Sequence, residues 1–427
     1  MENQKQISDL DALMHILKAA LGTGIYAMPV AFYSAGLFLS VGLTVLTGII
    51  CTHCATLLVK SSLTITEKTE KTKLTYPDIS ECACELGPEW AHKMARGFRI
   101  LTLVCLFVSY YLTLSCYAVI SARSFYYVVR VHVPEIPPIR IGIAALIIPM
   151  ILLVYIPHYK YLTPVSMGAN VLVLAALLIT YYYFFCGLPS LSERDAAGRD
   201  WIRYPTFFSI TIFGMMFIGV IMPLANTMKT PQHLVSTFGL FNIGMTIITF
   251  LNGFTGFFGY WRYGSEVEGS ITLNLPQEKI ECQVVNIFIG LAVFFSIGVQ
   301  FFVCHEIVYE PIAVRYGRTL LVDYVIRTII IVTAGGLAVA APFIVPFVSI
   351  LGALCFSTLG IMLPIVLYRL IHWEEGFGKI YWKAIKDIFV LLFGLAALIF
   401  GTVSAIDDTV KVFQEEFSSG STTTVAP

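Results

Sequence analysis

Charged side chains are scarce in this sequence of 427 residues, since only 13% are Asp, Glu, Lys or Arg while 57% are hydrophobic. Soluble domains carry roughly a quarter charged residues, so this chain has about half of that complement. Lys and Arg number 27, and so do Asp and Glu, which gives a formal net charge of zero. No positive surplus is available to neutralise phosphates, which argues against a nucleic-acid partner. The shortage of charge instead predicts a partner of another kind, the lipid bilayer.

Motifs of nucleotide-driven pumps and of enzymes are also missing. No G-x-x-x-x-G-K-[ST] run is present to cradle phosphates. The run CTHC, from Cys51 to Cys54, contains metal-type ligands, but it falls inside an apolar segment without a second ligand pair. The histidines, among them His92 and His305, follow no spacing that would place a metal or a nucleophile. We therefore expect no metal, no cofactor and no enzymatic activity.

Long hydrophobic runs dominate what is present. A membrane-spanning helix needs about 20 mostly apolar residues, and this criterion predicts an all-α polytopic membrane protein with about eleven transmembrane helices. The predicted spans are 13–33, 37–59, 98–129, 139–157, 163–186, 205–228, 236–261, 282–311, 320–340, 343–369 and 385–405.

The distribution of basic residues predicts the orientation of these spans. If the N-terminus is cytoplasmic, 17 of the 27 Lys and Arg residues fall on the cytoplasmic side and nine on the other side. This asymmetry favours a cytoplasmic N-terminal tail over 1–12 and a non-cytoplasmic C-terminal tail over 406–427. The C-terminal tail ends in the low-complexity run SSGSTTTVAP, which predicts disorder. The plasma membrane is favoured over the lysosomal membrane.

The first and sixth spans share an unusual feature, because each carries helix-breaking residues near its middle. The first has Gly22, Gly24 and Pro29, and the sixth has Gly214, Gly219 and Pro223. Lipid disfavours unpaired backbone groups, so such breaks must be buried in protein or line a wet cavity. Interrupted helices at corresponding places of two halves indicate a transporter with inverted repeats. The predicted repeats cover about 13–186 and 205–369, and an extra helix follows at about 385–405.

The two breaks together suit a zwitterionic substrate. Unwinding around Gly22, Thr23 and Gly24 leaves free N–H groups at the start of a half-helix, where the dipole favours a carboxylate. A break near Phe213 and Gly214 frees carbonyl groups that suit an ammonium group. Such a site needs no charged side chain.

Several runs resemble one known family. They are HILKAALGTG, GVIMPLANTMKTP, GYWRYGSEVEGSITLNLP, VQFFVCHEI and IKDIFVLLFGLAALIFGT. Together they are similar to the animal proton-assisted amino acid transporters of the amino acid/auxin permease family, over about residues 11–406. The resemblance implies a LeuT-like arrangement of five plus five helices with interrupted helices one and six. It also implies a central amino acid site and, in many members, proton coupling.

Carried over residue by residue, the resemblance assigns proton coupling to His15, and histidine changes charge near physiological pH. Two departures stand beside this match. Met216 occupies the place of an acidic residue in the sixth helix of the family. Cys282 matches one cysteine of an external disulfide, but the loop RVHVPEIPPIR between the third and fourth spans has no partner cysteine. Separately, Asp323 and Arg327 lie four residues apart, which predicts a local ion pair.

The sequence thus predicts a secondary transporter of small neutral amino acids that works by alternating access, as a proton symporter. Two alternatives remain open: a proton-independent facilitator, because the sixth-helix acid is absent, and an amino acid sensor of the endolysosomal membrane. Tyr110, Tyr111 and Met216 are expected to help set the shape of the side-chain pocket. The predicted substrate-binding residues are Gly22, Thr23, Gly24, Phe213, Gly214, Met216 and Gly219.

Overall fold

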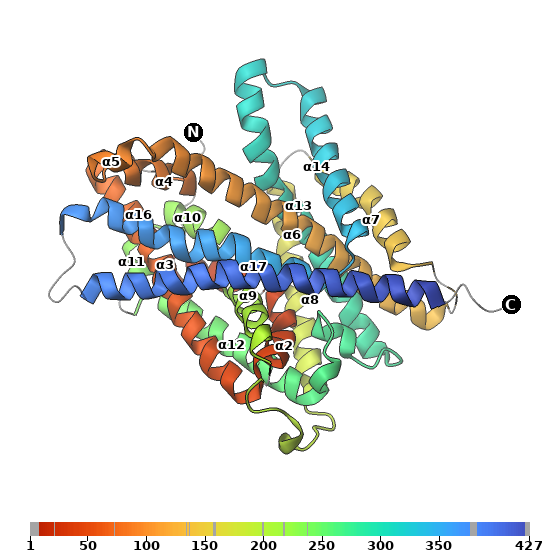
Figure 1. Ribbon diagram of the computed structural model, residues 1–427. Helices are drawn as coiled ribbons and strands as arrows, with labels where there is room; N and C mark the ends of the chain where they lie inside the picture. The colour runs from red at the N-terminus through yellow and green to blue at the C-terminus, as the bar shows by residue number, and fades with distance from the viewer. Residues whose placement is uncertain are drawn as a thin grey trace.

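The computed structural model describes residues 8–422, apart from 21, 72, 134, 136, 157–158, 199, 217, 237 and 376–381. The described chain folds into helices joined by loops (Figure 1). The first half contains α1 (Asp9–Ala20), α2 (Gly24–Ala35), α3 (Leu37–Thr69), α4 (Tyr76–Glu85), α5 (Glu89–His92), α6 (Ala95–His132), α7 (Ile139–Val154) and α8 (Tyr159–Phe184). The second half contains α9 (Tyr204–Met215), α10 (Ile218–Thr227), α11 (Gln232–Val235), α12 (Leu240–Tyr263), α13 (Ile280–Tyr316), α14 (Leu320–Ala340), α15 (Ile344–Ile350), η5 (Leu351–Met362), α16 (Leu363–Ile371) and α17 (Trp382–Thr422).

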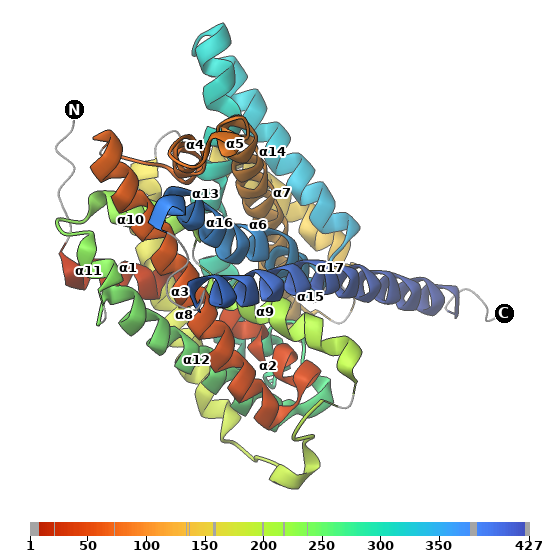
Figure 2. The same cartoon turned by 60° about the vertical axis from the view of Figure 1, so that its left-hand side comes forward.

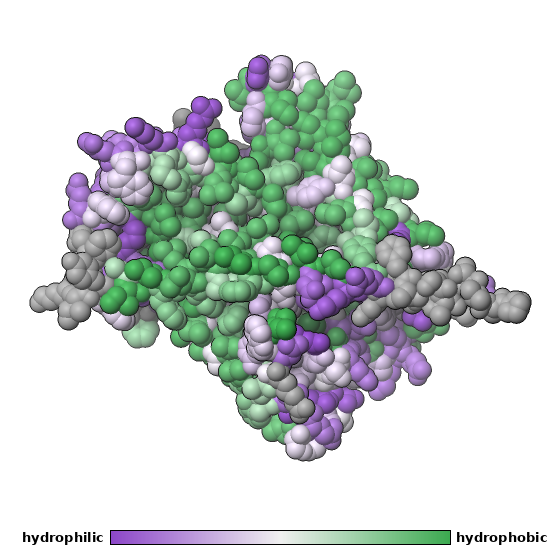
Figure 3. All heavy atoms as spheres, in the orientation of Figure 1, coloured by the Kyte–Doolittle hydropathy of each residue, from purple (hydrophilic) through white to green (hydrophobic). Residues whose placement is uncertain are grey.

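The helical body has the apolar surface that a bilayer requires. Among the described residues, eight helical stretches are long and apolar enough to span a membrane, and α7 and part of α8 are shorter apolar helices. The face seen in Figure 3 carries a broad hydrophobic band, with hydrophilic residues gathered at its upper-left and lower-right ends. The chain is therefore an all-helical, multi-pass membrane protein.

Several helices extend well past their predicted apolar spans. The helix α3 continues to Thr69 and α13 to Tyr316, where Gly317 ends the helix with φ of 86°. A positive φ of this size is available to glycine without a steric penalty. The sharp ending lets α14 turn back beside α13, and the two project from the body as a helical hairpin (Figure 1).

A short helix closes one end of the bundle. Thr75 and Asp78 form a reciprocal capping box at the start of α4, which satisfies two orphan N–H groups. The loop before α4 is tied to distant elements, because Asn226 of α10 donates to the Leu74 carbonyl at 2.9 Å. Tyr76 donates to the carbonyl of Leu359 in η5. These bonds join the connection after α3 to the sixth and tenth predicted spans.

The centre of the bundle is built around α2. It packs against α9 and α12, while α6 and α13 pack closely against each other. Beside them, η5 is a π-helical segment in the middle of a longer helix made with α15 and α16. π-Helical turns are rare and occur frequently at functional sites. The helices next to the two breaks, α2 and α9, are buried along most of their length.

The last helix is longer than the sequence predicted. Where we expected a tail without structure from residue 406 onward, α17 continues to Thr422. Two contacts account for its extension: Lys411 pairs with Asp407 one turn away, at 2.5 Å, and Asp408 accepts a hydrogen bond from Thr206 of α9 at 3.2 Å. An i, i+4 ion pair supports a helix locally, and the Thr206 bond anchors it to the body. Residues 423–427 lie outside the described part of the chain.

Candidate functional site

The first span is interrupted where its glycines predict. The helix α1 ends at Ala20, Gly22 and Thr23 are not helical, and α2 begins at Gly24. The first N–H groups of a helix have no partner within that helix. They carry the positive end of the helix dipole, so the start of α2 presents donors to the interior of the protein.

The sixth span is interrupted slightly later than predicted. Phe213 and Gly214 are still helical, and the break falls at Met216, whose backbone is extended with φ of −97° and ψ of 123°. The next helix, α10, begins at Ile218. The last carbonyl groups of α9 are therefore released at Met216, about one turn beyond Phe213.

Gly214 serves a different purpose from the one the sequence suggested. A Cβ atom built on Gly24 would lie 2.5 Å from the Cα of Gly214 and 3.1 Å from the Phe213 ring. The backbones of α2 and α9 therefore touch at these two glycines. Any larger side chain at Gly24 would separate the helices, so this pair brings the two interrupted spans into contact.

One buried oxygen atom at this crossing lacks a hydrogen-bond partner within the described chain. Asn252 of α12 is fully buried, and its Nδ2 donates to the carbonyls of Ile248 at 2.9 Å and Gly214 at 3.4 Å. Its Oδ1 accepts no hydrogen bond from the described residues, and it lies 3.0 Å from where a Cβ on Gly214 would be. Thr23 Oγ1 is also buried, and the phenol of Tyr117 lies beside it. Buried polar atoms are nearly always satisfied, so the open oxygen of Asn252 makes this crossing the candidate site.

Asn252 was not anticipated from the sequence. It occurs in the apolar run FLNGF, where a single asparagine has no informative spacing. An isolated polar residue in a span was the only available signal.

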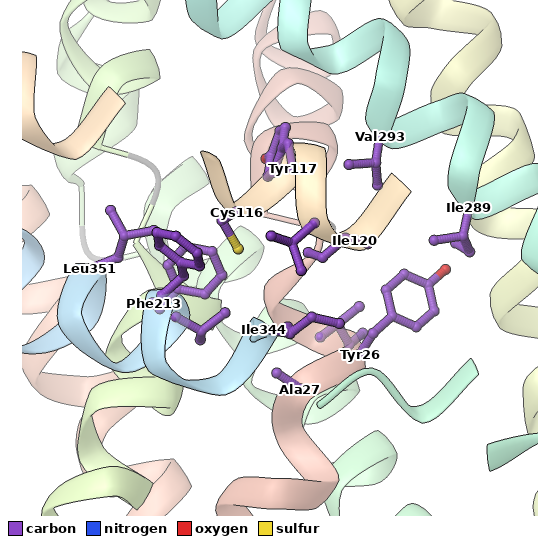
Figure 4. Packing of buried hydrophobic residues seen from close by; sticks show 14 of the residues in the cluster. Tyr26, Ala27, Cys116, Tyr117, Ile120, Phe213, Ile289, Val293, Ile344 and Leu351 are labelled. Carbon is purple, nitrogen blue, oxygen red and sulfur yellow. The ribbon is translucent and has the colours of Figure 1, made fainter. Parts of the chain in front are cut away.

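Apolar side chains from six helical segments lie around the crossing (Figure 4). They belong to one continuous buried cluster. Its members near the breaks are Tyr26 and Ala27 of α2, Cys116, Tyr117 and Ile120 of α6, Phe213 of α9, Ile289 and Val293 of α13, and Ile344 and Leu351 of α15 and η5. Their character suits an uncharged, apolar substrate side chain.

The remaining predicted residues of the sixth span face two different helices. The Sδ and Cε atoms of Met216 lie 2.7 Å from where a Cβ on Gly360 would be, so Met216 packs on η5. The hydroxyl of Tyr110 on α6 would lie 1.5 Å from a Cβ on Gly219. Gly219 therefore makes room for Tyr110, one of the residues expected to shape the pocket.

His15 lies apart from these contacts. It is an exposed residue of α1, and it forms no ion pair or hydrogen bond with other residues in the described chain. Nearby on the same helix, Asp9 pairs with His233 of α11 at 2.7 Å. The helix α1 is thus fixed at its start by another histidine.

A second polar cluster is buried between α13 and α14. The predicted pair of Asp323 and Arg327 is confirmed at 2.9 Å, and His305 Nε2 lies 2.7 Å from the other oxygen of Asp323. Arg327 also donates to the carbonyls of Val154 at 2.6 Å and Ile156 at 3.4 Å, where α7 ends. Neighbouring groups thus occupy both oxygens of the carboxylate and much of the guanidinium.

The cysteines form no disulfide among the described residues, and Cys282 is buried with a free thiol. The described residues also contain no group of three His, Cys, Asp or Glu side chains placed to hold a metal ion.

Comparisons with known proteins show which family and which fold this chain shares. A family model for transmembrane amino acid transporter proteins matches residues 5–407. The chain is 43% identical to Proton-coupled amino acid transporter-like protein pathetic of Drosophila melanogaster over 420 residues, which cover 98% of this chain and 89% of the relative. It is 24% identical to Vacuolar amino acid transporter 4 of Saccharomyces cerevisiae over 92% of this chain, but it spans only 57% of that protein's length.

Among solved structures, the chain resembles the crystal structure of MhsT in complex with L-phenylalanine. The match has a TM-score of 0.55 at 13% sequence identity and covers 94% of this chain and all of the other. It shows a shared LeuT-like fold. With the family model matching nearly the whole chain, the protein belongs to the transmembrane amino acid transporter family.

Proposed function

We propose that this protein carries small neutral amino acids through a site between its two interrupted helices, by alternating access and as a proton symporter. The observation that carries the proposal is the contact of α2 with α9 at Gly24 and Gly214, beside which the buried Oδ1 of Asn252 has no hydrogen-bond partner among the described residues. The substrate would supply that partner.

Each end of the substrate has a matching group. The N-terminus of α2 offers N–H donors and a positive dipole to the carboxylate. The C-terminal carbonyls of α9, together with Asn252 Oδ1, offer acceptors to the ammonium group. Thr23 adds a hydroxyl on the same side as the α2 amides. The apolar cluster around Phe213 and Ile120 would receive a neutral side chain, including chains larger than that of alanine.

The proposal includes the finer topology. We assign eleven spans, with α1 and α2 as the first and α9 and α10 as the sixth. The N-terminal tail over 1–12 is cytoplasmic, repeats cover about 13–186 and 205–369, and α17 forms the extra helix. Five spans per repeat force opposite orientations, which is the arrangement of inverted-repeat transporters. The basic residues favour a cytoplasmic N-terminus, and we propose the plasma membrane as the location.

The proton-coupling part of the proposal rests on His15 and on the name of the Drosophila relative. One observation favours a different carrier, a proton-independent facilitator: Met216, which replaces the family acid, packs against Gly360 and cannot titrate. In the proposed symporter, therefore, His15 is the residue to which we assign the coupling of proton movement to amino acid transport.

Uptake of labelled neutral amino acids tests the proposal. Cells expressing the chain are compared at about pH 5.5 and about pH 7.5, on either side of the pKa of about 6.5 that an ordinary histidine has, with His15→Ala and the matched control His92→Ala. We expect uptake that rises at acid pH, falls in His15→Ala and persists in His92→Ala. Saturable uptake that is indifferent to pH would establish the facilitator instead. Binding without uptake, by protein confirmed at the surface, would overturn transport in favour of a sensor.

A further inference from the structure

A groove runs between α3 and α12 on the outer surface of the helical body. These two helices lie side by side (Figure 2), and the groove between them has a volume of about 920 Å³. Its walls include Val45, Ile49 and Phe250, whose exposed fractions are 48%, 63% and 66%. The groove is therefore open to the hydrocarbon phase of the membrane and separate from the crossing of the interrupted helices.

The two ends of the groove differ in chemistry. Its polar groups on α3, among them Thr56 and Lys60, follow the apolar Val45 and Ile49 along the helix. On α12 the polar Asn242 lies near the start of the helix and the aromatic Phe254 lies farther along. The helices are antiparallel, so one end of the groove is polar and the other apolar. In the proposed orientation, on which this inference rests, the polar end is cytoplasmic.

The polar end also carries uncompensated positive charge. Lys60, Arg369, Lys386 and Asp387 all lie close enough to His53 to interact with it electrostatically. Arg369 and Lys386 both pair with Asp387. Lys60 has no ion-pair partner in the described part of the chain. His53 Nε2 is buried there without a hydrogen-bond partner. An anionic group would complement this end of the groove.

The groove is long enough to span one leaflet. Its lining residues on α3 run from Val41 to Lys60, which is about 28 Å along an α-helix. Half of a bilayer, headgroups included, is about 20–22 Å thick. Gly253 leaves space in the wall of the groove, because a Cβ there would meet nothing closer than Thr44 at 3.8 Å. The groove can therefore take the whole length of one phospholipid.

We propose that the groove binds one anionic phospholipid of the cytoplasmic leaflet. Its phosphate lies against Lys60 and His53, and its acyl chains follow Ile49 and Phe250 toward the middle of the membrane. A neutral phospholipid packs against the same apolar side chains but leaves Lys60 without a counter-charge.

Native mass spectrometry of the full chain tests this proposal, after purification from nanodiscs of phosphatidylcholine with or without phosphatidylserine. We expect one retained phosphatidylserine. Lys60→Gln should weaken retention about fivefold, the factor that corresponds to about 1 kcal/mol per basic residue near an anionic membrane. Gly253→Leu fills the groove and should remove the lipid without removing charge. Lys93→Gln is the matched control, because Lys93 is exposed and does not line the groove.

Three outcomes would overturn the proposal. Equal retention by Lys60→Gln and the unsubstituted chain would show that the charge is not used. Equal retention of phosphatidylcholine would show ordinary boundary lipid. A sterol that displaces phosphatidylserine from the unsubstituted chain, with retention insensitive to Lys60→Gln, would assign the groove to a different occupant. None of these outcomes depends on amino acid uptake, so failure here leaves the proposed transport function standing.

Discussion

The protein buries polar groups in two places, and it treats them in opposite ways. Between α13 and α14, Asp323 contacts both His305 and Arg327, and Arg327 also bonds to the end of α7. At the crossing of α2 and α9, Asn252 Oδ1 has no hydrogen-bond partner among the described residues, and Thr23 Oγ1 has only the Tyr117 phenol beside it. The first cluster pairs its charged groups within the protein, whereas the second leaves a buried amide oxygen open.

This difference separates a structural polar cluster from a binding site. A buried ion pair that loses one member leaves an uncompensated charge, which strongly destabilises the fold. An unpaired buried hydroxyl or amide oxygen lowers stability, and a ligand that supplies the missing partner recovers that loss. Substitutions in the first cluster should therefore change stability, whereas those at the crossing should change transport.

Replacing Arg327 should have the largest effect on stability. Arg327→Met leaves Asp323 with one partner fewer and the carbonyls of Val154 and Ile156 without this donor. Breaking a buried pair in this way costs about 3–5 kcal/mol, which should sharply lower the temperature of unfolding in detergent. The double variant Asp323→Leu with Arg327→Met should recover part of the loss, because no lone charge remains.

Arg318→Met is the matched control. Its pair with Glu310, at 2.9 Å, is largely exposed, and exposed pairs contribute about 0–1 kcal/mol. Equal destabilisation by Arg318→Met and Arg327→Met would contradict the distinction between a buried cluster and a surface pair.

Disrupting the contact between the two interrupted helices should have the next largest effect on stability. Gly24→Ala places a methyl group 2.5 Å from the Cα of Gly214, where only backbone movement can relieve the clash. Overpacking of this kind costs about 1–3 kcal/mol, and it would also separate Thr23 from Asn252. Uptake should therefore fall more than the amount of folded protein at the surface.

Gly42→Ala on α3 provides the comparison, because a Cβ there meets nothing within 4 Å. Removing a glycine from a helix interior should stabilise by roughly 0.5–1 kcal/mol. Normal uptake by Gly24→Ala would show that the two half-helices do not need this close contact.

The interrupted helices could be predicted from local sequence, whereas the complete site could not. The first span breaks at Gly22 and Thr23, as predicted, because the effect of a glycine is on its own backbone. Pro29, which the sequence offered as a second breaking residue, lies inside α2. The break at Met216 was predicted about one turn too early, since Gly214 is used for close packing with Gly24 and not for unwinding. The sequence alone does not distinguish a glycine that unwinds a helix from one that lets two helices pack closely.

Long-range partners explain what the sequence did not reveal. Asp323 and Arg327 were predictable because they lie on one turn of α14, but His305 joins them from another helix. Asn252 reaches Gly214 across 38 residues, and Asp408 extends α17 by bonding to Thr206, 202 residues away. Spacing along the chain carries no information about such contacts.

Removing the Thr23 hydroxyl should have the smallest effect on stability and the opposite sign. Thr23→Val keeps the shape of the side chain and removes a buried oxygen that forms no hydrogen bond of ordinary geometry with the described residues. The free energy of unfolding should stay constant or rise by about 1 kcal/mol, because an unsatisfied polar atom is lost. Substrate affinity should fall about tenfold, which corresponds to one hydrogen bond of about 1.4 kcal/mol. The affinity is measured as the substrate-dependent shift in unfolding temperature.

Thr333→Val is the control, since that hydroxyl bonds to the Ile329 carbonyl on an exposed face of α14. A variant of Thr23 that binds substrate normally would remove this hydroxyl from the site and leave Asn252 as the polar side chain that recognises the amino acid.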